Sequence, residues 1–149
     1  MAQTAPLPHL FGRFTAVIRD HANIGKTLEQ LHAMCAVLDS RRAALPRELM
    51  PGRLMFRFYQ ELSEHFATEE ADAYFGTVGD EEPSLASQIE ALKAEHWRML
   101  YAADMLCGMA VDRSRWRDMP GPVRELMTQL EQHERAESAL LRDLFHPAP

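Results

Sequence analysis

Residues 54–69 read LMFRFYQELSEHFATE, and this stretch decides the fold class of the chain. Its apolar positions return every three or four residues, at Leu54, Phe58 and Leu62, which is the period of an amphipathic α-helix. His65 and Glu69 continue the same stripe, so both side chains belong to the face that a helix buries. Because residues four apart are neighbours on a helix, this stretch presents an imidazole beside a carboxylate on a buried surface.

The same helical period occurs in three further segments, which are separated by groups of Pro and Gly at 46–52, 79–83 and 120–122. We therefore predict four helices, at roughly 10–43, 48–77, 83–111 and 120–145. Four long helices joined by short links favour an all-α fold, an up-down-up-down four-helix bundle. A chain of 149 residues fits one such domain, spanning 1–149.

Four more metal-suited residues lie on the other apolar stripes. His133 and Glu137 repeat the His-x-x-x-Glu phrase in the fourth segment, and His21 and His96 lie in the first and third. In an antiparallel hairpin, residues at equal height are equally far from the turn, because each residue rises by about 1.5 Å. The midpoints between successive histidines all fall in predicted loops, within 42–46, 79–83 and 112–116. The four histidines are therefore predicted to share one layer, with both glutamates about one turn away.

Six polar side chains in one buried layer require a compensating charge. Burying a carboxylate costs several kcal/mol unless it is paired, and the inward stripes carry no Lys or Arg. Metal ions can supply the charge, and imidazole with carboxylate suits iron, zinc, copper or manganese. If each Glu bridges two ions and each ion takes two His nitrogens, an added oxo or hydroxo bridge leaves an octahedral ion one open position. The pattern predicts a two-metal site for a small ligand, which two redox-active irons would use best.

The motifs follow a fixed order along the chain: His21, then His65-Phe-Ala-Thr-Glu69, then Glu95-His96, then His133-x-x-x-Glu137. This order, over about residues 9–146, resembles the hemerythrin-like, HHE cation-binding family. The resemblance implies a hemerythrin-like bundle that holds two non-haem iron ions joined by an oxo or hydroxo bridge. The implied metal ligands are four terminal histidines and two bridging glutamates: His21, His65, His96, His133, Glu69 and Glu137.

Two departures from the family pattern bear on function. Oxygen-carrying hemerythrins use a fifth histidine, in a His-x-x-x-His pair on the third helix, whereas Leu92 and Leu100 flank His96 at that spacing here. Glu137 also stands where those carriers have an aspartate. The resemblance is therefore nearer to proteins that repair iron-sulfur centres after nitrosative stress and to the iron- and oxygen-sensing module of a ubiquitin-ligase subunit.

We accordingly predict a di-iron protein that binds or senses oxygen, nitric oxide or peroxide, in a stress response or in iron-centre repair. Two alternatives stay open: a di-iron peroxidase or ferroxidase, and a structural bundle that holds zinc. Metal analysis separates the zinc alternative most cheaply, because zinc has no redox chemistry.

Composition narrows the expected partners and location. The net charge is −6, with acids spread among bases, so we expect no nucleic-acid partner. The sequence contains no apolar run near the roughly 20 residues of a membrane span, and its start lacks the layout of a signal peptide, so we expect a cytoplasmic protein without a membrane partner. Cys35 and Cys107 fall on apolar stripes and are predicted to be buried free thiols.

Several other residues are candidates for supporting roles near the layer. Glu95 could orient its neighbour His96 or gate access to the open position, and Glu61 could accept the second N–H of His65. Trp97 and Tyr101 could line a pocket, although ordinary packing is the simpler expectation. His32 lies eleven residues past His21, about 16 Å along the helix, which is too far for it to join the site. We expect it to be a core or loop-contact histidine.

Overall fold

The computed structural model describes residues 8–41, 44–71, 75–76, 79–80 and 82–145; for residues 8–21, 141, 144 and 145 it describes the backbone alone. Throughout this part of the chain the regular elements are helical. The four long helices are α1 (Pro8–Ser40), α2 (Pro51–Glu70), α4 (Ala86–Ala110) and α5 (Pro120–Phe145). Three short 3-10 helices lie between them: η1 (Arg47–Leu49), η3 (Pro83–Leu85) and η4 (Arg113–Asp118).

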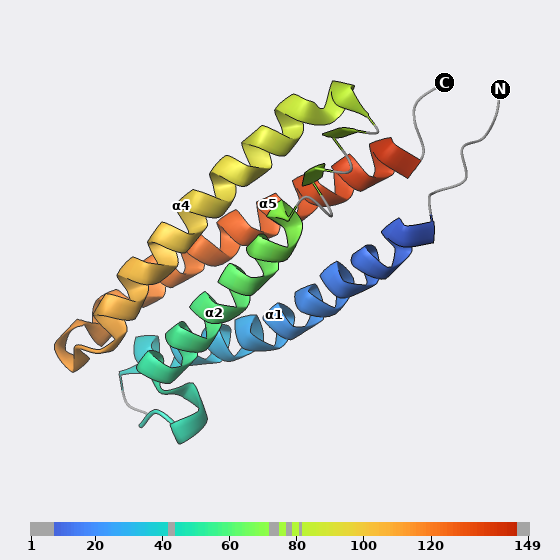
Figure 1. The fold of residues 1–149 in the computed structure, drawn as a ribbon. Coiled ribbons are helices and arrows are strands. Elements are labelled where there is room, and N and C mark those ends of the chain that lie inside the picture. Colours follow the sequence, from blue (N-terminus) through green and yellow to red (C-terminus); the bar gives the residue numbers. More distant parts are fainter. Residues whose placement is uncertain (1–7, 42–43, 72–74, 77–78, 81, 146–149) are drawn as a thin grey trace.

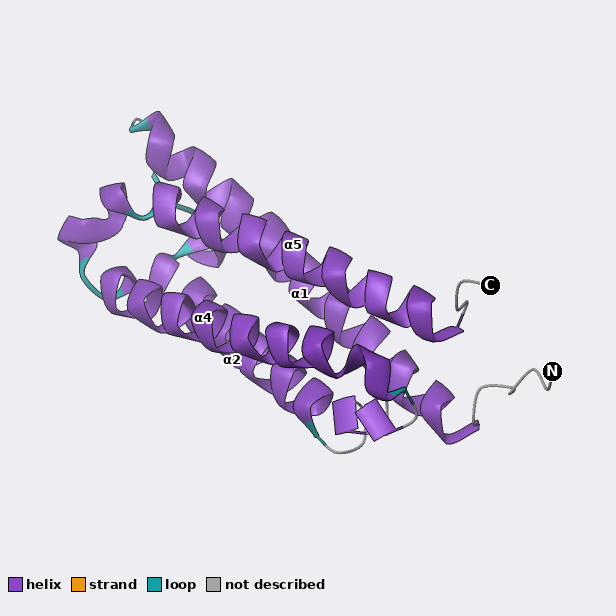
Figure 2. Ribbon diagram, turned by 90° about the horizontal axis from the view of Figure 1, so that it is seen from above, coloured by secondary structure: helices purple, strands orange, loops and turns teal. Residues whose placement is uncertain are grey.

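The four long helices pack in a closed ring, α1 against α2, α2 against α4, α4 against α5, and α5 back against α1. Each helix runs opposite to the one before it, and the turns that contain η1 and η4 lie at the same end of the molecule (Figure 1). The view from above shows the same four helices side by side (Figure 2). The predicted all-α fold, with four long helices packed against one another, is confirmed.

Residues 54–69 lie within α2, and this helix buries the expected stripe. Its buried residues include Leu54, Phe58, Leu62, His65 and Glu69. Apolar side chains from all four long helices meet them and form one continuous core. Of the helices the structure describes, none has both the length and the apolar character needed to cross a membrane.

The first helix ends earlier than the expected boundary near residue 43. Helix α1 stops at Ser40, and Arg41 adopts a left-handed backbone with a φ of 56°. This conformation stops helical propagation, since a non-glycine residue seldom adopts it inside a helix. The periodicity of apolar residues contains no signal for such a single-residue change.

The second helix is shorter at both ends than the expected range 48–77. Residues 47–49 form the separate turn η1, and α2 begins at Pro51, whose fixed φ and missing N–H suit a first helical position. It ends at Glu70 because Ala71 is extended, with a ψ of 142°. Residues 72–74 and 77–78 lie outside the described part of the chain.

The third helix also differs slightly from its expected range of 83–111. Residues 83–85 form the 3-10 turn η3, and α4 proper runs from Ala86 to Ala110. The fourth helix, α5, occupies Pro120–Phe145, where a helix over 120–145 was expected. The shortened ends leave the histidine-bearing turns of α2, α4 and α5 inside regular helix.

Candidate metal centre

Five of the six expected metal-suited residues meet in the interior of the bundle. Helix α2 supplies His65 and Glu69, α4 supplies His96, and α5 supplies His133 and Glu137. All five are buried, with at most 1% of each residue exposed to solvent. The sixth, His21, belongs to α1, but its side chain lies outside the described part of the chain.

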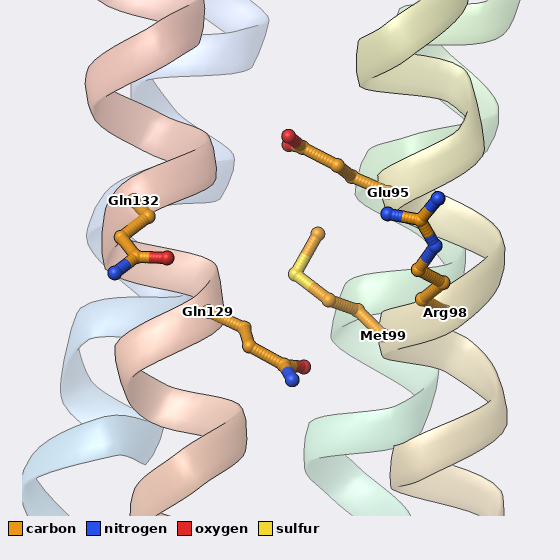
Figure 3. A pocket seen from close by; sticks show the side chains of 5 residues that line it. All are labelled: Glu95, Arg98, Met99, Gln129 and Gln132. Carbon is orange, nitrogen blue, oxygen red and sulfur yellow. The ribbon is translucent and has the colours of Figure 1, made fainter.

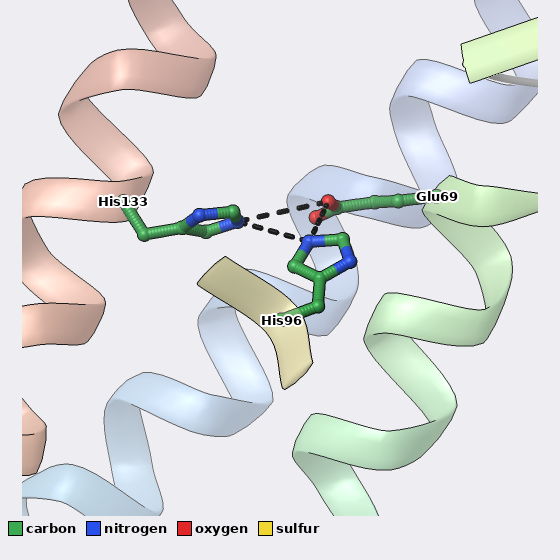
Figure 4. Close-up of side chains that lie close together, drawn as sticks. All are labelled: Glu69, His96 and His133. Carbon is green, nitrogen blue, oxygen red and sulfur yellow. Dashed lines mark hydrogen bonds and ion pairs between the residues drawn. The ribbon is translucent and has the colours of Figure 1, made fainter. Parts of the chain in front are cut away.

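Glu69 lies at the centre of this group. Its Oε1 contacts His65 Nε2, the partner one turn earlier on α2. Its Oε2 lies 3.0 Å from His96 Nε2 and 3.8 Å from His133 Nε2. The two Nε2 atoms of His96 and His133 lie 3.1 Å apart, so three helices aim donor atoms at one small volume (Figure 4).

The donor atoms form two groups that share one carboxylate. Glu69, His96 and His133 make the first group, and His65, Glu69 and Glu137 make the second; within each group the donor atoms lie within 4.8 Å of one another. Imidazole nitrogen with carboxylate oxygen is a donor set that suits several divalent metals. These buried His/Glu groups could therefore hold a metal ion, and Glu69 could contact an ion in either group.

The electrostatics of the group favour an ionised Glu69. Burial alone would raise the pKa of Glu69, but its contacts with His133, His65 and His96 outweigh burial and hold that pKa well below the usual range. Burial likewise would lower the pKa of His133, yet Glu69 and Glu95 outweigh it and raise that pKa. Because a histidine binds metal only in its neutral form, a proton and a metal ion compete for His133.

The charge balance of the interior supports a cation in this position. Glu69 and Glu137 are two buried carboxylates, and among the residues whose burial is described no Lys or Arg is buried. The positive charge that buried carboxylates require must therefore come from a protonated histidine, such as His133, or from a bound cation. The residues present thus fit a metal ion by donor type, convergence and charge.

Two further carboxylates contact the outward nitrogens of the histidines. His133 Nδ1 donates a hydrogen bond of 2.7 Å to Glu95 Oε2. His96 Nδ1 lies 3.6 Å from Glu70 Oε2. The hydrogen bond to Glu95 fixes the orientation of the His133 ring and leaves its Nε2 facing inward, whereas His96 Nδ1 is too far from Glu70 for a hydrogen bond. Glu95 was expected to orient His96, its sequence neighbour, but it contacts His133 across the α4–α5 interface instead.

Aromatic rings cover the site on the His96 side. Phe66 stacks on the His96 ring, with centroids 3.9 Å apart and planes 9° from parallel, and it meets His133 edge-on at 5.6 Å. Phe75 lies nearly parallel to His96 at 5.9 Å. These rings lower the local polarity and hold the imidazole in place. Sequence reasoning missed both, since a phenylalanine on a helical stripe reads simply as core.

The remaining candidates take other positions. Glu61 accepts a hydrogen bond of 2.7 Å from the buried Thr27 hydroxyl of α1, instead of the expected bond from His65. His32 is exposed, which corrects the expectation of a core position for it. Trp97 and Tyr101 lie on the outer surface of α4 and do not pack in the core, which corrects the packing expected for them.

A small cavity of about 160 Å³ opens between α4 and α5 next to the site. Its walls are Glu95, Arg98, Met99, Gln129 and Gln132 (Figure 3). Glu95 therefore has two roles, because it lines this cavity and also accepts the hydrogen bond from His133. The cavity wall is thus one hydrogen bond away from a candidate metal ligand.

Comparison of the chain with protein-family models, with curated proteins and with solved structures finds no match in any of the three. The residues of the chain itself are therefore the basis for inferring its function.

Proposed function

We propose that this protein is a non-haem di-iron protein that binds or senses a small ligand, either a diatomic molecule such as oxygen or nitric oxide, or peroxide. The observation that carries the proposal is the pair of buried His/Glu groups that share Glu69. A carboxylate common to two donor groups suits a bridge between two ions. In this proposal His21 of α1 completes the set of six ligands.

Iron is the favoured metal for two reasons. Mixed imidazole and carboxylate donors suit iron, whereas a structural zinc site is more often built with thiolates, and Cys35 and Cys107 are both outside the donor groups. The order of the motifs also resembles that of hemerythrin-like proteins. When bound, two irons supply a redox-active centre with room for a small ligand.

The residues of the chain would divide the work around this centre. Glu69 and Glu137 supply negative charge, and His65, His96 and His133 supply neutral donors. Glu95 holds His133 through Nδ1, which keeps Nε2 turned inward. Phe66, stacked on His96, excludes water from that face of the imidazole. A small apolar ligand could enter such a site more readily than a large or charged one.

The proposal can be tested by optical spectroscopy of the iron-loaded protein before and after exposure to nitric oxide or oxygen. We expect near-ultraviolet absorption from the iron centre, and we expect this absorption to change when the ligand binds. In the His96→Ala variant, the absorption should be lost together with the iron. The matched variant His32→Ala removes an exposed histidine from α1 and should keep both.

Two outcomes would replace the proposal. Retention of zinc with no spectral response to nitric oxide or oxygen would make the protein a structural zinc bundle. Steady turnover of hydrogen peroxide or ferrous iron, abolished by Glu137→Ala, would make it a di-iron enzyme instead of a binding protein.

A further inference from the structure

One aromatic ring contacts all three histidines of the two His/Glu groups. Phe66 of α2 is 1% exposed, and its ring stacks on that of His96, with the centroids 3.9 Å apart and the planes 9° from parallel. The same ring meets His133 edge-on at 5.6 Å and meets His65 at 5.8 Å, with the planes tilted by 49°. Phe66 therefore packs at once against imidazoles from α2, α4 and α5.

The two histidines of the first His/Glu group differ in what holds their outward nitrogens. His133 Nδ1 donates its 2.7 Å hydrogen bond to Glu95. Among the described residues none forms a hydrogen bond with His96 Nδ1, and Glu70 Oε2 lies 3.6 Å from it. A histidine that binds metal usually donates its second ring N–H to a carboxylate, a carbonyl or water, and this bond fixes the ring. The orientation of His96 therefore requires a different constraint.

Stacking on Phe66 supplies this constraint. A parallel ring 3.9 Å away blocks rotation of the imidazole about its Cβ–Cγ bond, because the rotated imidazole would collide with the phenyl face. His96 Nε2 then stays directed inward, 3.0 Å from Glu69 Oε2 and 3.1 Å from His133 Nε2 (Figure 4). Phe66 thus does for His96, by packing, what the Glu95 hydrogen bond does for His133.

The phenyl face also distinguishes a metal-bound imidazole from a free one. The face of an aromatic ring is the negative part of its quadrupole, so it attracts an electron-poor partner. A metal ion on Nε2 withdraws electron density from the imidazole and makes the His96 ring such a partner. Stacking on Phe66 therefore favours the metal-bound form of His96 by more than the filling of space alone.

We propose that Phe66 is a positioning residue of the metal centre, whose ring face orients His96 in place of an outer hydrogen bond and attracts its metal-bound form. This inference rests on the proposed binding of metal by the His/Glu groups, and it adds a residue that is not itself a ligand. Loss of the ring should weaken metal binding by about 10–100-fold, as loss of an outer-sphere partner does. Phe75 fits this role less well, because its ring is 5.9 Å from that of His96.

An ordinary core residue is the competing interpretation of Phe66, because its side chain also belongs to the apolar core. Phe58 provides the matched control. It is 0% exposed, belongs to the same core, and lies eight residues, about 12 Å, before Phe66 on α2. Leucine at either position keeps an apolar side chain in the core and removes the aromatic face. Both variants should lose stability, whereas Phe66→Leu alone should lose metal affinity.

The test is titration of the metal-free, full-length protein with cobalt(II), whose visible absorption reports the geometry of its ligands. Competition with a chelator gives the affinity, and urea denaturation without metal gives the stability. We expect Phe66→Leu to bind cobalt about tenfold or more weakly, with altered absorption, and Phe58→Leu to match the unmodified protein in both. Equal affinity of the two leucine variants, whether retained or lost, would overturn the proposal.

A second variant keeps the core filled and tests the ring face itself, even where Phe66→Leu does not fold. Pentafluorophenylalanine in place of Phe66 has a flat ring whose face is electron-poor, because fluorine withdraws electron density. We expect this variant to bind cobalt more weakly than the unmodified protein, and unchanged affinity would overturn the proposal.

These outcomes are distinguishable from failure of the proposed function. If the unmodified protein binds two irons and responds to nitric oxide or oxygen, but neither change at Phe66 alters its metal affinity, the proposed function stands and this inference is wrong. If the unmodified protein binds no cobalt and no iron, both are wrong. If it binds cobalt and zinc but shows no iron chemistry, the proposed function is wrong, and the variants still decide the role of Phe66.

Discussion

Two neighbouring residues of α4 differ sharply in burial, one on the inner face of the helix and one on the outer face. His96 is 1% exposed and meets Glu69 and His133 in the interior, while Trp97, the next residue, is 77% exposed. Globular proteins usually bury tryptophan to a greater degree than histidine. A helix that buries the polar residue and exposes the aromatic one therefore departs from the ordinary pattern twice. The buried histidine belongs to the proposed metal centre, whereas the exposed tryptophan lies outside it.

The largest expected difference in metal affinity is between the single substitutions of His96 and of Trp97. His96→Ala removes a donor from the first His/Glu group, so we expect metal affinity to fall by more than the roughly 10–100-fold that follows loss of an outer-sphere partner. Trp97→Ala should leave metal affinity unchanged, because its side chain is exposed on the outer surface of α4. Metal titration of the two purified variants measures the difference. Equal losses in both would remove the distinction between the faces.

Two methionines test the same contrast through stability. Met99 is buried on the inner face of α4, and Met105 is exposed on its outer face. Met99→Ala should lower the free energy of unfolding by about 2–5 kcal/mol through loss of buried surface and creation of a cavity. Met105→Ala should change it by less than about 0.5 kcal/mol. Urea denaturation of both variants gives the comparison, and a larger cost at Met105 would mean that the outer face of α4 is covered in the native protein.

A smaller effect is expected at Glu95, which lies between the two faces. Glu95→Gln keeps a hydrogen-bond acceptor for His133 Nδ1 but removes the charge, so metal affinity should fall by about tenfold. Glu90→Gln, one turn and a half earlier on exposed helix, provides the control. Competition with a metal chelator measures the metal affinity of both variants. Equal affinity in Glu95→Gln and the unmodified protein would show that this contact does not tune the site.

The smallest expected effect concerns the two cysteines. Burial raises the pKa of Cys35 and of Cys107, which lowers the thiolate fraction at neutral pH and slows reaction with thiol reagents. Cys35 is fully buried and should react most slowly, whereas Cys107 on α4 is partly exposed and should react first. Mass spectrometry during alkylation follows each residue separately. Reaction of Cys35 ahead of Cys107 would indicate local opening of α1.

Much of the inner face could be predicted from the sequence, because it depends on regularities of the helix. The spacing of apolar residues located the four long helices, and counting outward from the turns placed His65, His96 and His133 at one height. The ends of the helices could not be predicted as well from the sequence. They depend on single-residue backbone states, such as the positive φ of Arg41 and the extended backbone of Ala71, which no periodicity contains.

For the carboxylates that contact the site histidines from outside, the sequence predicts only their level along the bundle axis. The midpoint of Glu95 and His133 falls in the turn between α4 and α5, so counting places them level with one another. Which histidine Glu95 contacts depends on its rotation around α4, and a count along the axis carries no information about rotation. Rotation could have placed Trp97 outside, since it lies about 100° around the helix from His96. The stacking of Phe66 on His96 needed the folded chain, because it joins side chains of two helices.

The most direct test of the metal centre is a count of ions bound as metal-free protein is titrated with ferrous iron without oxygen. We expect two ions per chain for the unmodified protein. Because Glu69 belongs to both His/Glu groups, Glu69→Ala should lose both ions, while Glu64→Ala, an exposed neighbour on α2, should keep both. Binding of one ion or none by the unmodified protein, or of two ions by Glu69→Ala, would contradict a two-metal centre that shares this carboxylate.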